Sequence, residues 1–335
     1  MIKMRVPRLT IVAAACAAIF LVAGGARAKG SAAPEHPKII LGLPVPATTF
    51  LPIYIAADRT WKPEGLDVKV VTFRGDAGVS EALAGGSVEI SCQSLDGLVS
   101  LLESKQPVIG FWAGFDQADF AWYAQSSIKT WNDLKGKTIG VSTYGSLTDQ
   151  LTRAVLRKHG LDPQSDVRII HSGPSMAAYQ AVKAGRLDAA ILSVPSKLMA
   201  HENGLTLLGT QAKEISSTWP KHICLAEKSF IQNNPKTIKA FIRGIVNAEK
   251  LAKAHPKYAI GILEKQLKYQ PKFARQAYQE AIGGFDETGE LPPKATMKKF
   301  WQVTISSGKV KKAIPNSRLL DRTFIEGFKT PAKAK

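Results

Sequence analysis

The sequence predicts an α/β protein with two lobes built on largely parallel sheets. Short runs of β-branched residues alternate with helical patterns, which is typical of βαβ units. This alternation occurs twice along the chain, over residues 38–111 and 138–194. Residues 81–90 and 180–189 also share one order, in which a helix end is followed by glycine, an acidic residue and a strand. We interpret these matched segments as two similar lobes.

The first stretch opens with a strand over residues 38–43, which Pro44 and Pro46 end. A helix is expected over residues 51–59, because Ile55 follows Leu51 at a helical spacing. Further strands are expected over 67–73, 88–92 and 108–111, and further helices over 79–84 and 95–103.

The second stretch opens with a buried strand over residues 138–141. Ser146-x-x-Asp149 resembles a capping box at the start of the next helix, and Gly160 is expected to end that helix in the left-handed conformation. Strands are expected over 167–170, 187–194 and 222–226, with one helix from Pro174 to Ala184 and a mainly helical chain from Pro235 onward.

The N-terminus has the layout of a secretory signal peptide. A basic segment (Lys3, Arg5, Arg8) precedes an apolar run over residues 9–22, and Ala26-Arg27-Ala28 supplies a cleavage site. The apolar run is short of the roughly 20 residues that span a bilayer, which disfavours a membrane anchor. Cys16 leaves lipidation as a second alternative. We expect residues 1–28 to be removed near Ala28 and the protein to be periplasmic.

The chain is basic, with a formal net charge of +18. Such a charge can indicate nucleic-acid binding, but export argues against that partner. The basic residues are dispersed except in the C-terminal third, so we interpret them as a solvated surface. Steering of anionic ligands toward a cleft is the alternative.

The sequence contains no recognisable catalytic or metal-binding motif. It has no G-x-S-x-G, no H-E-x-x-H and no CxxC, and its histidines are scattered. We therefore expect a binding protein rather than an enzyme, with no metal or cofactor. Cys92 and Cys224 would survive export, which permits a disulfide, but their spacing does not say whether they meet.

Several segments resemble one family, the solute-binding proteins of sulfonate, nitrate, taurine and thiamine-precursor importers. The resemblance is carried by residues 51–57, 61–68 and 81–90, and most strongly by Trp131-Asn132-Asp133-Leu134-Lys135-Gly136-Lys137-Thr138-Ile139-Gly140-Val141. Residues 181–190 and 230–235 fit as well. Trp61 departs from the usual glycine and aromatic pair at a position that looks structural.

The resemblance implies a type II periplasmic-binding-protein fold, in which two α/β lobes are joined by two crossover strands and close on a ligand by hinge motion. Lobe I would comprise residues 36–125 plus 222–335, and lobe II residues 126–221. The protein would be the monomeric substrate-binding component of an ABC importer, with a cognate permease as partner. The ligand would be a small organic solute such as a sulfonate or carboxylate. A thiamine-type pyrimidine or other heteroaromatic is the alternative ligand, and an enzyme or sensor on the same fold is the alternative function.

Ligands of open α/β lobes bind at the carboxyl ends of strands, where helix N-termini offer free N–H groups. This rule selects the following candidate ligand-binding residues: Thr48, Thr49, Phe50, Arg74, Asp76, Gln93, Ser94, Trp112, Asp116, Ser142, Thr143, Tyr144, Ser146, Gly173 and Pro195. Arg74 suits an anion, whereas Asp76 and Asp116 suit an amine or a heteroaromatic N–H. The residues thus leave the charge of the ligand open.

Overall fold

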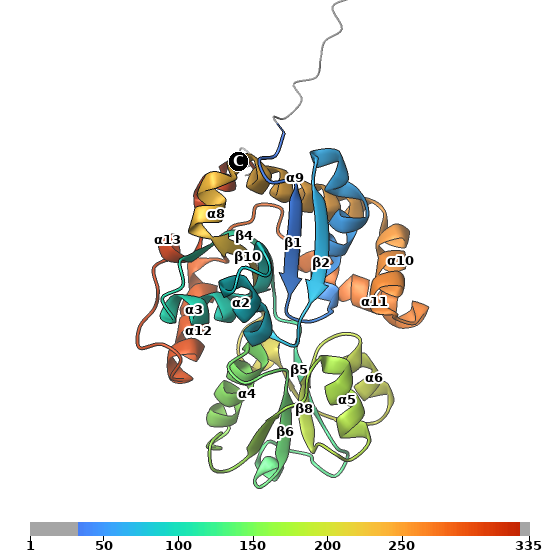
Figure 1. The fold of residues 1–335 in the computed structure, drawn as a ribbon. Helices are drawn as coiled ribbons and strands as arrows, with labels where there is room; N and C mark the ends of the chain where they lie inside the picture. Colours follow the sequence, from blue (N-terminus) through green and yellow to red (C-terminus); the bar gives the residue numbers. More distant parts are fainter. Residues whose placement is uncertain (1–32, 329–335) are drawn as a thin grey trace, which may run out of the picture. The chain divides into compact units, whose positions relative to one another are not determined.

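The computed structural model describes residues 33–328, and the predicted signal peptide lies outside them. Two five-stranded sheets organise this part of the chain (Figure 1). In order, the first sheet contains β2 (Asp67–Thr72), β1 (Lys38–Leu43), β3 (Ile90–Ser94), β10 (Thr218–Glu227) and β4 (Val108–Gln117). The second contains β7 (Arg168–His171), β6 (Thr138–Val141), β8 (Ala189–Leu192), β5 (Ala121–Ala124) and β9 (Thr206–Thr210). The predicted two-lobed α/β fold is confirmed.

Both sheets mix parallel and antiparallel pairs. In the first, β1 pairs in parallel with β2 and β3, while β10 runs antiparallel between β3 and β4. In the second, β6 pairs in parallel with β7 and β8, while β5 runs antiparallel between β8 and β9. The chain therefore passes from one sheet to the other between β4 and β5, and returns between β9 and β10.

The lobe boundaries at residues 125/126 and 221/222 stay a prediction, and two strands bear on it. β5 (Ala121–Ala124) pairs within the second sheet, although the prediction assigned these residues to lobe I. β10 pairs within the first sheet from Thr218, which lies opposite Gln117, although the prediction assigned residues 218–221 to lobe II.

Helices flank both sheets. Those around the first sheet are α1 (Leu51–Ile55), α2 (Asp76–Ala84), α3 (Leu95–Glu103), α8 (Lys228–Asn233), α9 (Pro235–Ala254), α10 (Pro256–Leu267), α11 (Pro271–Ala281), α12 (Lys294–Ser306) and α13 (Asn316–Leu319). Those around the second are α4 (Leu147–Lys158), α5 (Ser175–Lys183), α6 (Ser196–Glu202) and α7 (Gln211–Glu214). A π-helical turn (Ala56–Thr60) extends α1, and 3-10 turns cover 48–50, 62–64, 132–134, 282–284, 322–324 and 326–328.

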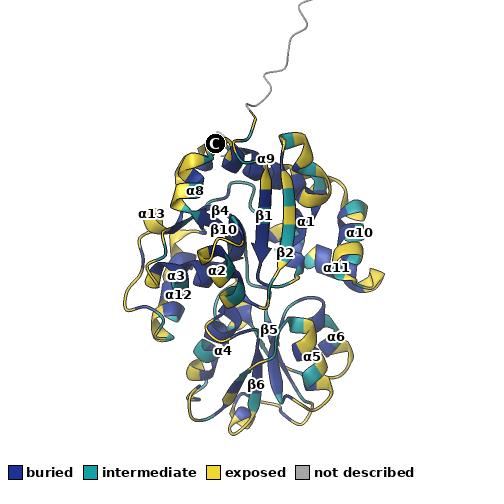
Figure 2. Ribbon diagram, viewed as in Figure 1, coloured by how far each residue is buried: buried dark blue, intermediate teal, exposed yellow. Residues whose placement is uncertain are grey.

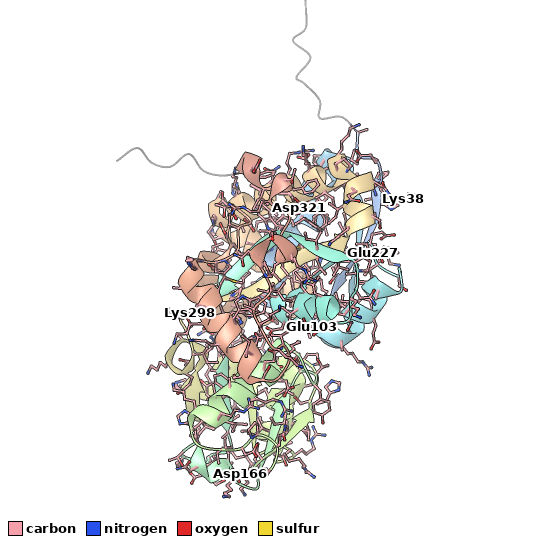
Figure 3. All side chains as sticks on the ribbon, turned by 90° about the vertical axis from the view of Figure 1, so that its left-hand side faces the viewer. Lys38, Glu103, Asp166, Glu227, Lys298 and Asp321 are labelled. Carbon is pink, nitrogen blue, oxygen red and sulfur yellow. A yellow bond between two sulfur atoms is a disulfide. The ribbon has the colours of Figure 1, made fainter. Side chains whose placement is uncertain are left out.

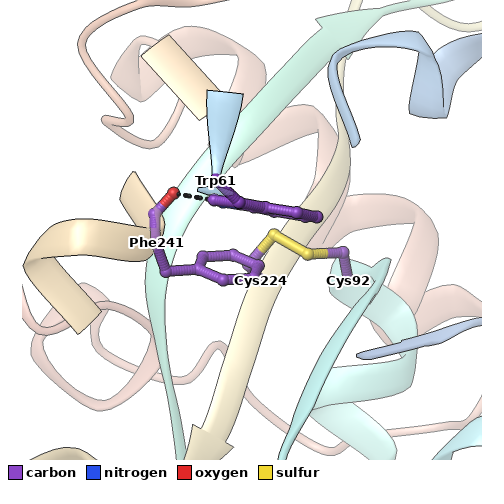
Figure 4. The surroundings of a disulfide bond; sticks show 4 residues. All are labelled: Trp61, Cys92, Cys224 and Phe241. Atoms are coloured by element: carbon purple, nitrogen blue, oxygen red, sulfur yellow. Dashed lines mark hydrogen bonds between the residues drawn. A yellow bond between two sulfur atoms is a disulfide. The ribbon is translucent and has the colours of Figure 1, made fainter. Parts of the chain in front are cut away.

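The strands and the inner faces of the helices form the core (Figure 2). Long helix α9 carries its apolar stripe against the first sheet, and Phe241 on this stripe is fully buried. Trp61 stacks on the Phe241 ring with centroids 4.7 Å apart, and its Nε1 donates to the Phe241 carbonyl at 2.9 Å (Figure 4). Trp61 is therefore a core residue, as its departure from the family pattern suggested. Figure 3 labels charged residues of both halves, among them Lys38 on β1, which is exposed, and Asp166, which is partly exposed.

Cys92 and Cys224 form a disulfide, which the sequence alone left undecided (Figure 4). Cys92 on β3 lies directly opposite Cys224 on β10 in the antiparallel register. Adjacent positions on paired strands bring the two side chains together, although they are 132 residues apart in sequence.

Four local predictions were wrong in detail. The loop expected at residues 112–116 is part of β4, which is extended by its irregular pairing with β10. Helix α2 begins at Asp76, three residues early, and Ser94 ends β3 instead of lying in a loop. The capping box is also absent: Ser146 Oγ donates to the Thr143 carbonyl at 2.7 Å, and Asp149 Oδ2 accepts from the Gly145 N–H at 2.8 Å.

Candidate functional site

A cavity of about 80 Å³, here called the cleft, is lined by residues of both sheets and of the two crossings between them. From the first sheet and its loops come Pro44, Val45, Pro46, Ala47, Thr49, Gly75, Asp76, Ser94, Lys221 and His222. From the second sheet come Ser142, Leu147, Thr148, Gly173, Pro174, Ser175, Ile191 and Ser193, with Phe120 at the other crossing. An occupant of the cleft would contact both sheets at once.

The two sides of the cleft approach each other closely at Gly75. This residue has φ +101°, and a Cβ added there would lie 2.5 Å from Thr143 Oγ1. The turn after β2 therefore needs glycine for its backbone conformation and for its closeness to the second sheet.

The first-sheet side presents a carboxylate held by a serine. Asp76 Oδ2 accepts from Ser94 Oγ at 2.8 Å, and Asp76 Oδ1 accepts from the Ser94 N–H at 3.3 Å. Ser94 Oγ in turn accepts from the Gly97 N–H at 3.0 Å, so it caps α3. Asp76 is thus fixed in orientation with a carboxylate at the cleft.

The second-sheet side presents hydroxyl groups near two helix N-termini. Ser142 Oγ lies 2.8 Å from Thr148 Oγ1 and 3.0 Å from Ser146 Oγ. Ser175, the first residue of α5, accepts from the Ser193 N–H at 2.9 Å. Hydroxyls and the N-terminal ends of α4 and α5 suit an anionic or polar group of a ligand.

The crossings contribute a buried ion pair. Lys221 Nζ on β10 pairs with Asp119, and their side chains are 5% and 6% exposed. The Lys221 nitrogen also lies 4.2 Å from the centre of the Phe120 ring. Burial lowers the pKa of Lys221, and Asp119 opposes that shift. The positive charge at the cleft is therefore already matched by a carboxylate.

His222 follows Lys221 on β10 and lines the cleft in its neutral form. Burial and the neighbouring Lys221 charge hold its pKa well below the usual value. Its ring lies 4.3 Å from the Phe50 ring, centre to centre. A neutral imidazole can donate through one nitrogen and accept through the other.

The structure brings five of the predicted site residues to the cleft: Thr49, Asp76, Ser94, Ser142 and Gly173. Thr143 and Ser146 lie just behind it, against Gly75 and Ser142. Phe50 and Trp112 line a separate inner cavity with His222, and Asp116 lines another beside β4.

The other five predicted residues lie away from the cleft lining. Arg74 is exposed and Tyr144 is 59% exposed. Thr48 is buried with its hydroxyl 3.4 Å from the Tyr269 hydroxyl, and Gln93 Oε1 accepts from Ser80 at 3.0 Å. Pro195 precedes α6.

Sequence reasoning missed several residues of the cleft, among them Phe120, Thr148, Ser193, Lys221 and His222. One sequence signal could have drawn attention to Lys221, since it is a charged residue directly before the strand predicted over residues 222–226.

Residues 33–328 contain neither a metal-binding cluster nor a membrane-spanning helix. No group of three or more His, Cys, Asp and Glu side chains in this range could hold a metal ion. No helix in it has the length and apolar character needed to cross a membrane.

A family model described as NMT1/THI5 like matches residues 47–259. YtlA of Bacillus subtilis, named as a candidate binding protein, is 27% identical over 62% of this chain and 63% of its own length. The chain thus spans less than two thirds of that relative. The taurine-binding periplasmic protein of Escherichia coli is 24% identical over 77% of this chain and 78% of its own length. A synthase of 4-amino-5-hydroxymethyl-2-methylpyrimidine phosphate from Candida albicans is also 24% identical, over 62% and 65%.

Solved structures share the fold at low sequence identity. A protein of Bordetella bronchiseptica superposes with a TM-score of 0.77 at 23% identity, covering 88% of this chain and 98% of the other. The periplasmic aliphatic sulphonate binding protein of Escherichia coli gives 0.66 at 16% identity, covering 86% and 99%.

Proposed function

Because this chain belongs to the NMT1/THI5-like family, we propose that it is the substrate-binding component of an ABC importer, which captures a small organic solute in the periplasm. The observation that carries the proposal is the cleft, which is lined by residues of both sheets. Gly75 from the first-sheet side lies close to Thr143 from the second. A ligand held there stabilises closure, because it gains contacts with both sheets only when they approach.

The cleft, with a volume of about 80 Å³, suits a small solute. The hydroxyls and helix ends on the second-sheet side would hold a sulfonate or carboxylate group. Asp76 on the first-sheet side would hold a donor group at the other end. A solute with an anionic end and a donor end fits both sides.

The same proposal implies that the protein is exported and that a membrane permease is its partner. The names of periplasmic relatives support a periplasmic location. Export would use the N-terminal signal peptide read from the sequence, with cleavage near Ala28. The loaded protein would act as a monomer and deliver its ligand to a cognate permease in the inner membrane.

A pyrimidine-type ligand, or an enzyme that makes one, is the second candidate. It is favoured by the relative named as a pyrimidine phosphate synthase and by Phe120 and His222, whose rings line the cleft. Turnover would release a new pyrimidine product, whereas a transport protein would return its ligand unchanged.

The proposal is tested by a thermal-shift screen of protein purified from the periplasm of an expression host and refolded to remove bound ligand. The compounds are taurine, alkyl and aryl sulfonates, aromatic carboxylates, nitrate, pyrimidines and flavins. A ligand at about 100 times its Kd adds about 2.7 kcal/mol, which raises the Tm by several degrees. A screen in which no compound raises the Tm would contradict the proposal.

A further inference from the structure

A second, smaller cavity lies within the first-sheet half, directly behind the cleft. Its volume is about 30 Å³, enough for about two water-sized groups. Thr49 and His222 line both this inner cavity and the cleft. The two spaces therefore adjoin at these two residues.

Four residues of the inner cavity carry buried polar atoms without a hydrogen-bond partner among residues 33–328. They are Thr49 Oγ1, Trp112 Nε1, His222 Nδ1 and both carboxylate oxygens of Glu249. Trp112 and Glu249 are fully buried. Leaving such groups unpaired costs free energy, so a cluster of four in one small space indicates a polar occupant.

Three of the four polar groups of the inner cavity can accept a hydrogen bond, whereas the Trp112 indole N–H can only donate one. The carboxylate of Glu249 only accepts when ionised, and the Thr49 hydroxyl and a neutral His222 can also accept. Aromatic rings of Phe50, Trp112 and Phe115 line the same space. Aromatic rings around a carboxylate are suited to a cation with several N–H donors.

We propose that the inner cavity binds the ammonium group of a small organic amine, with the Glu249 carboxylate as its counter-ion. The cavity offers an anion no positively charged partner, because His222 is neutral. A primary ammonium is as small as water and offers three donors, which matches both the volume and the acceptors of the cavity. That the amine belongs to the transported solute rests on the proposed function, whereas the preference of the cavity for ammonium does not.

The charges around Glu249 are consistent with an exchange of a proton for the ammonium group. Burial raises the pKa of Glu249 well above its usual value. Lys253 opposes this shift, but it is 2.7 Å from Glu287, and Asp286 and Glu287 both add to the shift. His222 faces the cavity in neutral form, and Lys221 beside it is paired with Asp119. Without a ligand Glu249 therefore keeps its proton, and a bound ammonium would displace it.

The probe for this cavity is methylammonium chloride, compared with sodium chloride at the same ionic strength. For two non-hydrogen atoms a millimolar Kd is near the attainable limit, so we expect about 100 mM methylammonium to raise the Tm by about 2 °C. Glu249→Gln keeps the size of the side chain but cannot ionise, and it should lose this shift. Glu264→Gln, the same change on neighbouring α10, should keep it. No difference between the salts, or an equal shift in E249Q, would overturn the proposal.

The pH dependence tests the same exchange without any variant, so the test survives if E249Q fails to fold. Protons compete with methylammonium for Glu249, so the shift should decrease as the pH falls. A shift that is independent of pH would contradict the role of Glu249. Transport is judged separately: panel solutes that bind equally well to wild type and E249Q would leave the proposed function intact and refute the inference. If methylammonium binds but no solute of the panel does, the inference would stand and the proposed function would be refuted.

Discussion

Lys309 Nζ donates a hydrogen bond to the Gly145 carbonyl oxygen at 2.8 Å. Lys309 follows α12, while Gly145 lies in the loop between β6 and α4 of the second sheet. Burial lowers the pKa of Lys309, and carboxylates from both sides oppose that shift: Asp96 and Asp76 from the first, and Asp149 from the second. The Lys309 ammonium group therefore interacts with acidic residues of both halves.

Replacing Lys309 by methionine should weaken closure and thereby ligand binding. A charge-assisted hydrogen bond of a partly exposed lysine contributes about 1 kcal/mol, which corresponds to roughly a fivefold loss of affinity. Isothermal titration measures the change. Lys312→Met, at an exposed position of the same segment, is the matched control and should bind as wild type does. Equal affinities of all three proteins would show that Lys309 does not favour closure.

Asp96 should make the protein less stable as the pH rises. Burial raises its pKa to about 6 from 3.8, while Lys309 opposes and Asp76 adds to the shift. Between these values the folded state binds more protons than the unfolded state, so the free energy of unfolding falls with increasing pH and levels off above about 6.

The variant Asp96→Asn removes this titration. Its free energy of unfolding relative to wild type should increase by about 2 kcal/mol between about pH 4.5 and about pH 7.5. Asp67→Asn, an exposed position on β2, controls for the loss of one charge. Denaturant unfolding at several pH values measures the trend, and a constant difference between D96N and wild type would refute the assignment.

The buried pair of Lys221 and Asp119 should be sensitive to the loss of one partner. Lys221→Met leaves the Asp119 carboxylate buried without its cation, which costs about 3–5 kcal/mol of folding stability. The double variant with Asp119→Asn has no uncompensated charge and should recover most of that loss. Chemical denaturation of the single and double variants measures the coupling, and additive effects would contradict it.

The disulfide should contribute strongly to stability. The bridge spans 132 residues, for which the chain-entropy model gives about 5 kcal/mol. Since measured values are often smaller, we expect Cys92→Ala with Cys224→Ala to lose about 2–5 kcal/mol in denaturant unfolding. Two thiols that react with maleimide after unfolding without reductant would contradict the bridge.

Local signals predicted much of the fold. β1 (Lys38–Leu43), β6 (Thr138–Val141) and α3 (Leu95–Glu103) match their predicted bounds, because apolar runs and turn residues within each segment define them. β4 and β10 are longer than predicted, since their length depends on pairing with each other across the sheet. The four-residue β5 was missed because its partners, β8 and β9, lie far along the chain.

The site was predicted only in part, for a related reason. The carboxyl-end rule led to Asp76, Ser94 and Ser142, which line the cleft. The rule predicts which loops lie at the site but not the direction in which each side chain points. Arg74 lies in a loop that reaches the cleft, yet its side chain is exposed. Lys221 lies inside β10, and its position at the crossing depends on how the two sheets meet.

The central claim, that a ligand is bound between the two sheets, is tested most directly by titrating the strongest ligand of the screen into Gly75→Ala. Gly75 and Gly86 both have positive φ, so alanine strains the backbone at either site. Only at Gly75 would the new Cβ meet Thr143 across the cleft; at Gly86 nothing lies within 4 Å. We predict at least about a tenfold loss of affinity for G75A and wild-type affinity for G86A. Wild-type affinity in G75A would contradict binding by closure of the two sheets.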